Sequence, residues 1–349
     1  MATTGQWLES NTFHYTQFSD VVDLVRRKQE RGLTISLCIP TLNEAHTIAR
    51  VVAPLRLELK ERAPLLDEIA VIDSGSSDKT MELAAAAGAE VYLAADILPE
   101  FGHYCGKGEN LWKAVYQLKG DILVFVDGDI CNMHPRFVTG LVGPLLHHAE
   151  IGYVKSFYDR PSRLEGVARD FGGGRVTEIL IRPLFSLYFP ELTAFIQPLA
   201  GEYAVRREIL EQLAFPVGYG VETAHLLDLY AAQGLGVFAQ TDCLLRRHRS
   251  RTNQELGRTA FAVLQVMERR LQARGILLAA HQGNGGLRQF RRQGQHYSQE
   301  VRQIVEHERP PMGLVAAYWQ KRDRPCPGEG LSAEHTICAN GYLTAAGGR

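Results

Sequence analysis

Two patterns of apolar and polar residues alternate along the first 130 residues. Short apolar runs, rich in β-branched residues, predict strands. They lie at 34–40, 68–76, 91–94 and 121–127. The segments between them read as helices, at 43–59, 77–89 and 106–120. Regular alternation of strand and helix is typical of a doubly wound, mostly parallel sheet, so the pattern predicts an α/β fold.

Outside this region the patterns are less regular. A short amphipathic helix is expected at 18–32, with Ser19 as its N-cap. Beyond residue 150 we expect strands at 152–161 and 236–250 and helices at 175–188, 218–234 and 259–275. After residue 281, Gly, Gln and charged residues dominate, which predicts loops with one or two peripheral helices.

Composition narrows the class of protein. The chain has 349 residues, of which 45% are hydrophobic and 22% charged, and its formal net charge is -1. These values are typical of a globular protein and argue against a general nucleic-acid-binding surface. No run of about 18 apolar residues predicts a membrane helix, and the N-terminus lacks the features of a signal peptide. Six cysteines without metal-binding spacing fit a reduced, cytoplasmic setting.

Two carboxylates close the strand predicted at 121–127. Asp127 and Asp129 are separated only by Gly128, at the sheet edge where α/β proteins bind ligands. Because two ionised carboxylates repel each other, they favour a cation beside them. Oxygen ligands suit Mg²⁺ or Mn²⁺, and Mg²⁺ commonly joins carboxylates to substrate phosphates. The motif predicts either such a site or a turn with solvated aspartates.

Three loops beside this strand carry further polar groups. Residues that could wall and hydrogen-bond a nucleoside lie in IPTLNEAHT: Pro40, Leu42 and Glu44. The small residues of DSGSSDKT (73–80) permit close approach of a ligand, or merely cap the next helix. GHYCGKG lacks the spacing of a P-loop, so Lys107 is either an anion-binding lysine at a helix start or an exposed turn residue.

Two glycine-rich segments and a basic run follow. FGGGRVTEI combines free backbone amides with Arg175 and Thr177, as in an anion cradle, although a hinge with a surface arginine has the same pattern. GYGVE places Glu222 at a helix start, where it meets the helix dipole or holds sugar hydroxyls. In RRHRSR the surrounding charge would keep His248 neutral and able to ligate a metal, but the run also reads as an ordinary basic surface.

Taken in order, these segments resemble one family. The chain resembles the glucosyl-3-phosphoglycerate synthases and the related mannosyl-3-phosphoglycerate synthases, which are retaining glycosyltransferases of GT-A fold. The matching segments span residues 34–256: IPTLNEAHTI, VIDSGSSDKT, GKGENLW, GDILVFVDGDICNMHPRFVTGLVGPLL, YVKSFYDRP, GGGRVTEILIRPL, QPLAGEY, FPVGYGVE and RRHRSR.

The resemblance implies roles for the matching residues. Those that would contact the nucleotide are Pro40, Leu42, Glu44, Ser74, Lys107 and Asp127. Asp127 and Asp129 form the family's Asp-x-Asp motif, with Asp129 and His248 as ligands of Mg²⁺ (or Mn²⁺). Glu222 would hold the donor sugar and, with the two aspartates, serve catalysis. Arg175, Thr177 and the glycines before them, helped by Arg246, would bind the phosphate and carboxylate of the acceptor 3-phosphoglycerate. The full set of expected substrate-binding residues is Gly174, Arg175, Val176, Thr177, Tyr219, Glu222, Arg246 and Ser250.

The family's organisation implies four parts of the chain. These are an N-terminal extension with a short helix (1–33), the nucleotide-sugar-binding part of the GT-A domain (34–150), the acceptor-binding part with the metal histidine (151–275) and a C-terminal extension (276–349). A cytoplasmic homodimer is expected. Two positions depart from the glucosyl pattern: Ser250 stands where Asn is usual, and Thr41 where Ala is frequent.

The implied reaction moves glucose, with UDP-glucose as expected donor, to 3-phosphoglycerate with retention of configuration. We expect same-face attack, in which the leaving diphosphate accepts the proton, and a metal that offsets its charge. The product would be a precursor of a glycerate-linked compatible solute. Alternatives are mannosyl transfer from GDP-mannose, an inverting transferase acting on a lipid phosphate, and a catalytically silent binding protein on the same fold.

Overall fold

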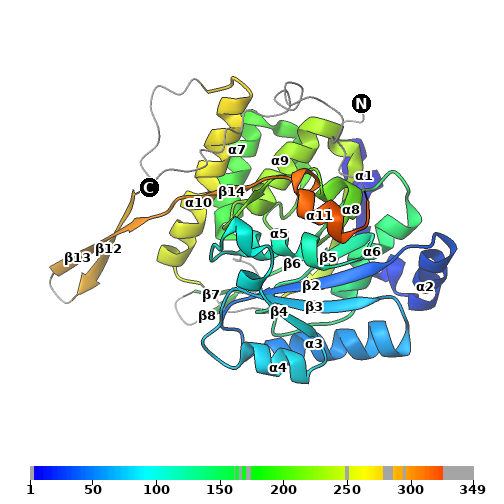
Figure 1. Cartoon of the computed structure of the whole chain (residues 1–349). Helices are drawn as coiled ribbons and strands as arrows, with labels where there is room; N and C mark the ends of the chain where they lie inside the picture. The colour runs from blue at the N-terminus through cyan, green and yellow to red at the C-terminus, as the bar shows by residue number, and fades with distance from the viewer. Residues whose placement is uncertain are drawn as a thin grey trace.

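The centre of the molecule is an eight-stranded sheet with the strand order β1-β11-β6-β9-β5-β2-β3-β4 (Figure 1). The computed structural model describes residues 4–160, 162–164, 167–169, 174–247, 251–277, 286–293 and 296–324. The strands of the sheet are β1 (Thr12–His14), β2 (Ile35–Thr41), β3 (Glu68–Asp73), β4 (Glu90–Leu93), β5 (Ile122–Phe125), β6 (Tyr153–Asp159), β9 (Tyr203–Arg206) and β11 (Phe238–Leu245). Only β9 runs antiparallel to its neighbours, β5 and β6, so the expected mostly parallel sheet is confirmed.

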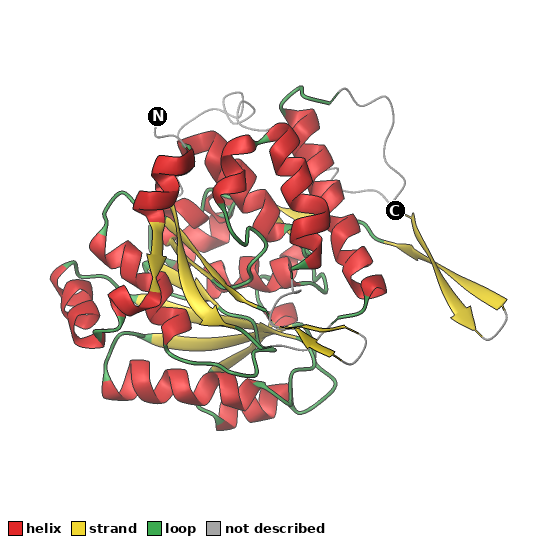
Figure 2. Ribbon diagram, turned by 180° about the vertical axis from the view of Figure 1, so that it is seen from behind, coloured by secondary structure: helices red, strands yellow, loops and turns green. Residues whose placement is uncertain are grey.

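Helices cover both faces of the sheet (Figure 2). One face packs against α2 (Val21–Glu30), α3 (Ile48–Arg56), α4 (Thr80–Ala86) and α6 (Arg136–His147). The other face packs against α1 (Thr4–Asn11), α5 (Lys107–Gln117), α7 (Arg182–Tyr188), α8 (Arg207–Leu210), α9 (Val221–Gln233), α10 (Asn253–Ala273) and α11 (Ala316–Lys321). Because both faces are covered, central strands such as β5 are apolar and buried at every position.

The N-terminal segment belongs to the sheet. Strand β1 pairs in parallel with β11 at the sheet edge. The buried indole of Trp7 donates to the Phe238 carbonyl at 3.2 Å, which fixes α1 beside the same strand. The predicted cap of α2 was wrong by one residue: Asp20, not Ser19, accepts from the backbone amides of Val22 and Asp23.

The C-terminal segment contains strands that the sequence did not predict. β12 (Gly286–Gln293) and β13 (His296–Gln303) form an antiparallel hairpin that projects from the body (Figure 1). The expectation of loops and helices alone was therefore wrong here, because its Gly- and Gln-rich sequence hides the alternation of a strand. Beyond the hairpin, β14 (Glu308–Arg309) pairs with β10 (Phe215–Pro216), and the short strands β7 (Ser162–Leu164) and β8 (Val167–Arg169) pair with each other. Among the described helices, none is long and apolar enough to cross a membrane.

Candidate active site

Charged side chains beside three strands meet where the central strands end. Asp127 and Asp129 follow β5, and Arg246 follows β11. Glu202 precedes β9, and because β9 is antiparallel its first residues lie at the same edge as the ends of β5 and β6. The sheet topology therefore gathers residues that are more than a hundred positions apart in sequence.

Lys107 joins two of the predicted carboxylates. Its Nζ lies 2.6 Å from Oδ1 of Asp127 and 2.8 Å from Oε1 of Glu222. Burial opposes the charge of Lys107, but the two carboxylates outweigh it and hold its pKa well above the usual range. Gly201 packs so closely against this cluster that a Cβ there would overlap both Lys107 and Asp127.

Arg246 joins the two aspartates of the Asp-x-Asp motif. Its Nη2 lies 2.8 Å from Oδ2 of Asp127 and 2.8 Å from Oδ1 of Asp129. Its Nε forms an ion pair with Oε1 of Glu202 at 2.9 Å. Although burial alone would raise the pKa of Asp127, Lys107 and Arg246 hold it well below its usual range. Both aspartates therefore face the same guanidinium nitrogen of Arg246.

The carboxylate oxygens of Asp127 and Asp129 are suitable ligands for a divalent cation. One carboxylate oxygen of each aspartate lies 2.8 Å from the same guanidinium nitrogen, and carboxylate oxygens are the ligands that Mg²⁺ prefers. Within the described residues, no group of three or more His, Cys, Asp and Glu side chains could hold a metal on its own. A metal at Asp129 would need further ligands, such as substrate phosphates or His248, which lies outside the described residues.

The loops after β2 and β3 lie on the side of the site where the sequence predicts the nucleoside. The Thr41 hydroxyl donates to buried Asp73, and Ser74 donates to Asn110 of α5 at 2.9 Å. Pro40 lies near the end of β2, and Leu42 and the half-buried Glu44 follow that strand. Burial and the charge of Asp129 raise the pKa of Glu44 to about 7. Pro40 and Glu44 also pack close to Gly128, so these two predicted nucleoside residues lie next to the aspartate pair.

A second group of predicted residues surrounds Arg175. Gly174 has a left-handed backbone (φ 82°), and Thr177 is buried in the turn that follows. Arg175 donates to the carbonyl of Arg251 at 2.5 Å and to the side chain of Asn253. The Arg251 guanidinium lies over the ring of Tyr219, 5.0 Å from its centroid, and close enough to Asp129 and Asp127 to feel their charge. This arginine connects the two groups of residues.

The structure tests the proximity of the predicted residues but not their roles. It brings together Lys107, Asp127, Asp129, Glu222 and Arg246. Gly172, Gly173, His248 and Ser250 lie outside the described residues. Sequence reasoning missed Glu202 and Arg251. The pairing of β9 could not be read from the sequence, but Arg251 ends the basic run that contains His248, and that run was a usable signal.

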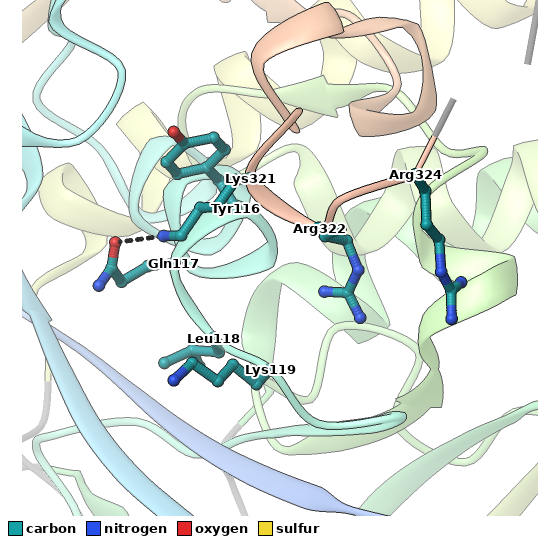
Figure 3. A pocket seen from close by; sticks show the side chains of 7 residues that line it. All are labelled: Tyr116, Gln117, Leu118, Lys119, Lys321, Arg322 and Arg324. Carbon is teal, nitrogen blue, oxygen red and sulfur yellow. Dashed lines mark hydrogen bonds between the residues drawn. The ribbon is translucent and has the colours of Figure 1, made fainter. Parts of the chain in front are cut away.

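A separate hollow lies at the other end of α5 (Figure 3). It encloses about 240 Å³, and its lining residues are Tyr116, Gln117, Leu118, Lys119, Lys321, Arg322 and Arg324. None of the predicted site residues lines it. Lys321 donates to Gln117 across its mouth at 2.9 Å.

Fold and site together define a glycosyltransferase of GT-A fold. The model of the family described as "Glycosyl transferase family 2" matches residues 36–212. That range holds the nucleotide-side loops, the Asp-x-Asp motif and Glu202.

Similarity to individual proteins identifies a narrower group within this family. The chain is 48% identical to a glucosyl-3-phosphoglycerate synthase of Petrotoga mobilis, over 89% of this chain and 95% of that protein. It is also similar to the crystal structure of mannosyl-3-phosphoglycerate synthase from Rubrobacter xylanophilus (TM-score 0.82, 35% identity, 89% and 97% of the two chains).

A third relative has known ligands. Glucosyl-3-phosphoglycerate synthase of Mycobacterium tuberculosis, in complex with Mn²⁺, UDP and phosphoglyceric acid, has a TM-score of 0.75 and 39% identity, over 86% of this chain and 97% of that one. The same enzyme has been crystallised with Mg²⁺ and UDP and with Mn²⁺ and UDP-glucose. The chain belongs to the glucosyl-3-phosphoglycerate synthase family.

Proposed function

We propose that the protein transfers glucose from UDP-glucose to 3-phosphoglycerate and forms glucosyl-3-phosphoglycerate. The observation that carries the proposal is the convergence of Lys107, Asp127, Asp129, Glu222 and Arg246 at one sheet edge, in a chain that is 48% identical to a glucosyl-3-phosphoglycerate synthase. The nucleoside would lie against Pro40, Leu42, Glu44 and Ser74. The acceptor would bind Gly174, Arg175, Val176, Thr177, Tyr219 and Ser250.

A divalent cation, Mg²⁺ or Mn²⁺, would be held by Asp129 and His248 and, when bound, would supply Lewis-acid stabilisation of the leaving nucleotide. Lys107 would add positive charge at the same diphosphate, and Arg246 would help to bind the acceptor. Glu222, released from Lys107 by the donor phosphates, would accept hydrogen bonds from sugar hydroxyls.

The bond from the anomeric carbon to the diphosphate would break while the acceptor hydroxyl attacks from the same face. The hydroxyl proton would pass to an oxygen of the leaving diphosphate, so that no protein base is needed. Arg175 and Thr177 would orient the acceptor phosphate and carboxylate, and the rate would come mainly from positioning and charge stabilisation.

Mannosyl transfer is the second candidate, and the similarity to the mannosyl-3-phosphoglycerate synthase structure favours it. UDP-glucose, GDP-glucose and GDP-mannose at equal concentration, each with 3-phosphoglycerate and Mg²⁺, would separate the two by the configuration of the product. Predominant mannosyl product would overturn the glucosyl proposal. Hydrolysis or binding without transfer from any of the three donors would overturn transfer itself.

We further propose a cytoplasmic homodimer that makes a precursor of a glycerate-linked compatible solute. Four described cysteines, Cys38, Cys105, Cys131 and Cys243, are free thiols, which favours a reducing compartment. A two-stranded hairpin is barely stable alone, and β12–β13 exposes Phe290 and Val301. A second copy of the chain covering this hairpin would supply the missing burial. Sedimentation of the purified protein as a monomer would contradict the dimer.

A further inference from the structure

Glu202 is a buried carboxylate: one oxygen lies in an ion pair without a well-aligned hydrogen bond, and the other is hydrogen-bonded. Its exposed fraction is 0%. Oε1 forms the ion pair with Nε of Arg246, and Oε2 accepts a hydrogen bond from the Tyr158 hydroxyl. A buried carboxylate loses the solvation of water and persists in folded proteins only with such partners. Burial raises the pKa of Glu202 and the Arg246 guanidinium opposes that rise, so the negative charge of Glu202 depends on its ion pair with Arg246.

Strand β6 holds Glu202 in place. The backbone amide and the hydroxyl of Ser156 donate to the Glu202 carbonyl at 3.1 and 3.0 Å. One residue earlier in β6, buried Lys155 donates to the Ala200 carbonyl at 2.8 Å. Burial lowers the pKa of Lys155 to about 8. Hydrogen bonds from β6 thus fix the segment that carries Glu202 on both sides of Gly201. A movement of the Arg246 side chain would therefore not displace the backbone of Glu202.

Arg246 is one cation among three carboxylates. Its guanidinium contacts Asp127 and Asp129 with Nη2 and Glu202 with Nε. Asp129 is also a proposed ligand of the divalent cation and Asp127 lies beside it, so the guanidinium competes with that cation. The strength of this competition depends on how far a nearby negative charge, here that of Glu202, offsets the positive charge of Arg246.

We propose that Glu202 is a positioning residue for the cation site. It fixes the guanidinium of Arg246 in one orientation and balances its charge, so that Asp127 and Asp129 remain able to bind a divalent cation. The inference rests on the proposed function for the presence of that cation, and it adds a residue that lies behind Arg246 rather than in contact with the metal or the substrates.

The test measures Mn²⁺ binding, not turnover. Glu202→Gln keeps the shape of the side chain and one accepting oxygen but removes its charge. The free Mn²⁺ signal in electron paramagnetic resonance, titrated with the full chain, gives the dissociation constant. We expect Glu202→Gln to weaken Mn²⁺ binding about tenfold. Tyr158→Phe is the matched control: it removes one hydrogen bond to the same carboxylate, leaves the charge, and should bind Mn²⁺ within about twofold of the wild type.

Wild-type Mn²⁺ affinity in Glu202→Gln would overturn the inference, and so would an equal loss in Tyr158→Phe. If Glu202→Gln does not fold, Glu202→Gln/Arg246→Met removes one charge of each sign and the competing guanidinium, and should bind Mn²⁺ at least as tightly as the wild type. Weaker binding by this double variant would also overturn the inference. A failure of the proposed function would appear elsewhere, as wild-type protein that transfers no sugar.

Discussion

The ammonium group of Lys107, at the first residue of α5, lies 2.8 Å from the carboxylate of Glu222, at the second residue of α9. The same group contacts Asp127, so a single lysine links the donor-side helix, the Asp-x-Asp motif and the residue proposed to hold the sugar.

We expect Lys107→Met to lower kcat/KM for the donor by about 10- to 100-fold, because a charge-assisted hydrogen bond contributes about 1.5–3 kcal/mol. Steady-state kinetics at saturating acceptor would measure it. Lys119→Met is the control, since that lysine is exposed and lies two residues beyond the far end of α5. An unchanged kcat/KM in Lys107→Met would remove the lysine from the donor site.

Asp129→Ala should abolish sugar transfer while leaving the melting temperature within a few degrees, because a partly exposed carboxylate at a strand end packs little. Excess chelator should have the same effect on the wild type, and added Mg²⁺ or Mn²⁺ should reverse it. Asp96→Ala changes an exposed aspartate outside the site and should keep wild-type activity. Full activity with chelator would refute the metal requirement.

Arg175→Ala should raise KM for 3-phosphoglycerate about tenfold or more and leave KM for the donor nearly unchanged, because it removes one charge-assisted hydrogen bond to the acceptor. Arg62→Ala, which alters an exposed arginine paired only with Glu58, serves as the control. Unphosphorylated glycerate used as efficiently as 3-phosphoglycerate would contradict an acceptor phosphate site at Arg175.

Gly201→Ala should reduce activity much more than stability. The added methyl group would collide with the ends of Lys107 and Asp127, which are flexible side-chain atoms that can move away without unfolding the sheet. We expect at least about a tenfold fall in kcat with a small change in melting temperature. Gly236→Ala, where a Cβ has open space, should change neither. A fully active Gly201→Ala would show that the tight ion cluster is not required.

His225 should make the fold sensitive to acid. Both ring nitrogens are buried without a partner among the described residues. Burial, with the charges of Lys155 and Arg270, lowers the pKa of His225 from 6.5 to about 3. A depressed folded-state pKa means that stability is present above pH 6.5 and is lost as the pH falls toward 3, because only the unfolded chain binds the proton.

Between pH 7.5 and pH 5 this group should cost about 2 kcal/mol of unfolding free energy. His225→Leu should lose correspondingly less over the same interval, as measured by urea unfolding at the two pH values. Equal losses in the wild type and in His225→Leu would show that another group controls the acid response.

The sequence predicted the site best where function coincides with a strand end. Asp127 follows an uninterrupted apolar run. Such a run can be recognised in the sequence as a strand, because a parallel strand with both faces covered is apolar at nearly every position. Glu202 gave no such signal, because it reaches the site only through the antiparallel insertion of β9 between β5 and β6, a long-range pairing. Its ion pair with Arg246 likewise depends on the order of strands.

The secondary structure of the two terminal segments was the hardest to predict from the sequence. Strand β1 has three residues, too few for a recognisable alternation, and it forms only because the edge of β11 is available. The hairpin β12–β13 has strands of eight residues, but Arg, Gln and Ser occupy most of its positions, so that no apolar face marks it. In both segments a partner elsewhere, rather than local preference, decides the conformation.

The pairing of β1 with β11 also has a consequence for biosynthesis. Thr12 accepts a hydrogen bond from Gln240, which lies 228 positions later in the chain and is therefore translated after it. At about 5–20 residues per second, the N-terminal segment waits tens of seconds for its partner strand to be translated. During that interval Trp7 has no partner strand to pack against, because its indole is buried beside Phe238 of β11. The N-terminal segment can therefore reach its final position only after β11 has been synthesised.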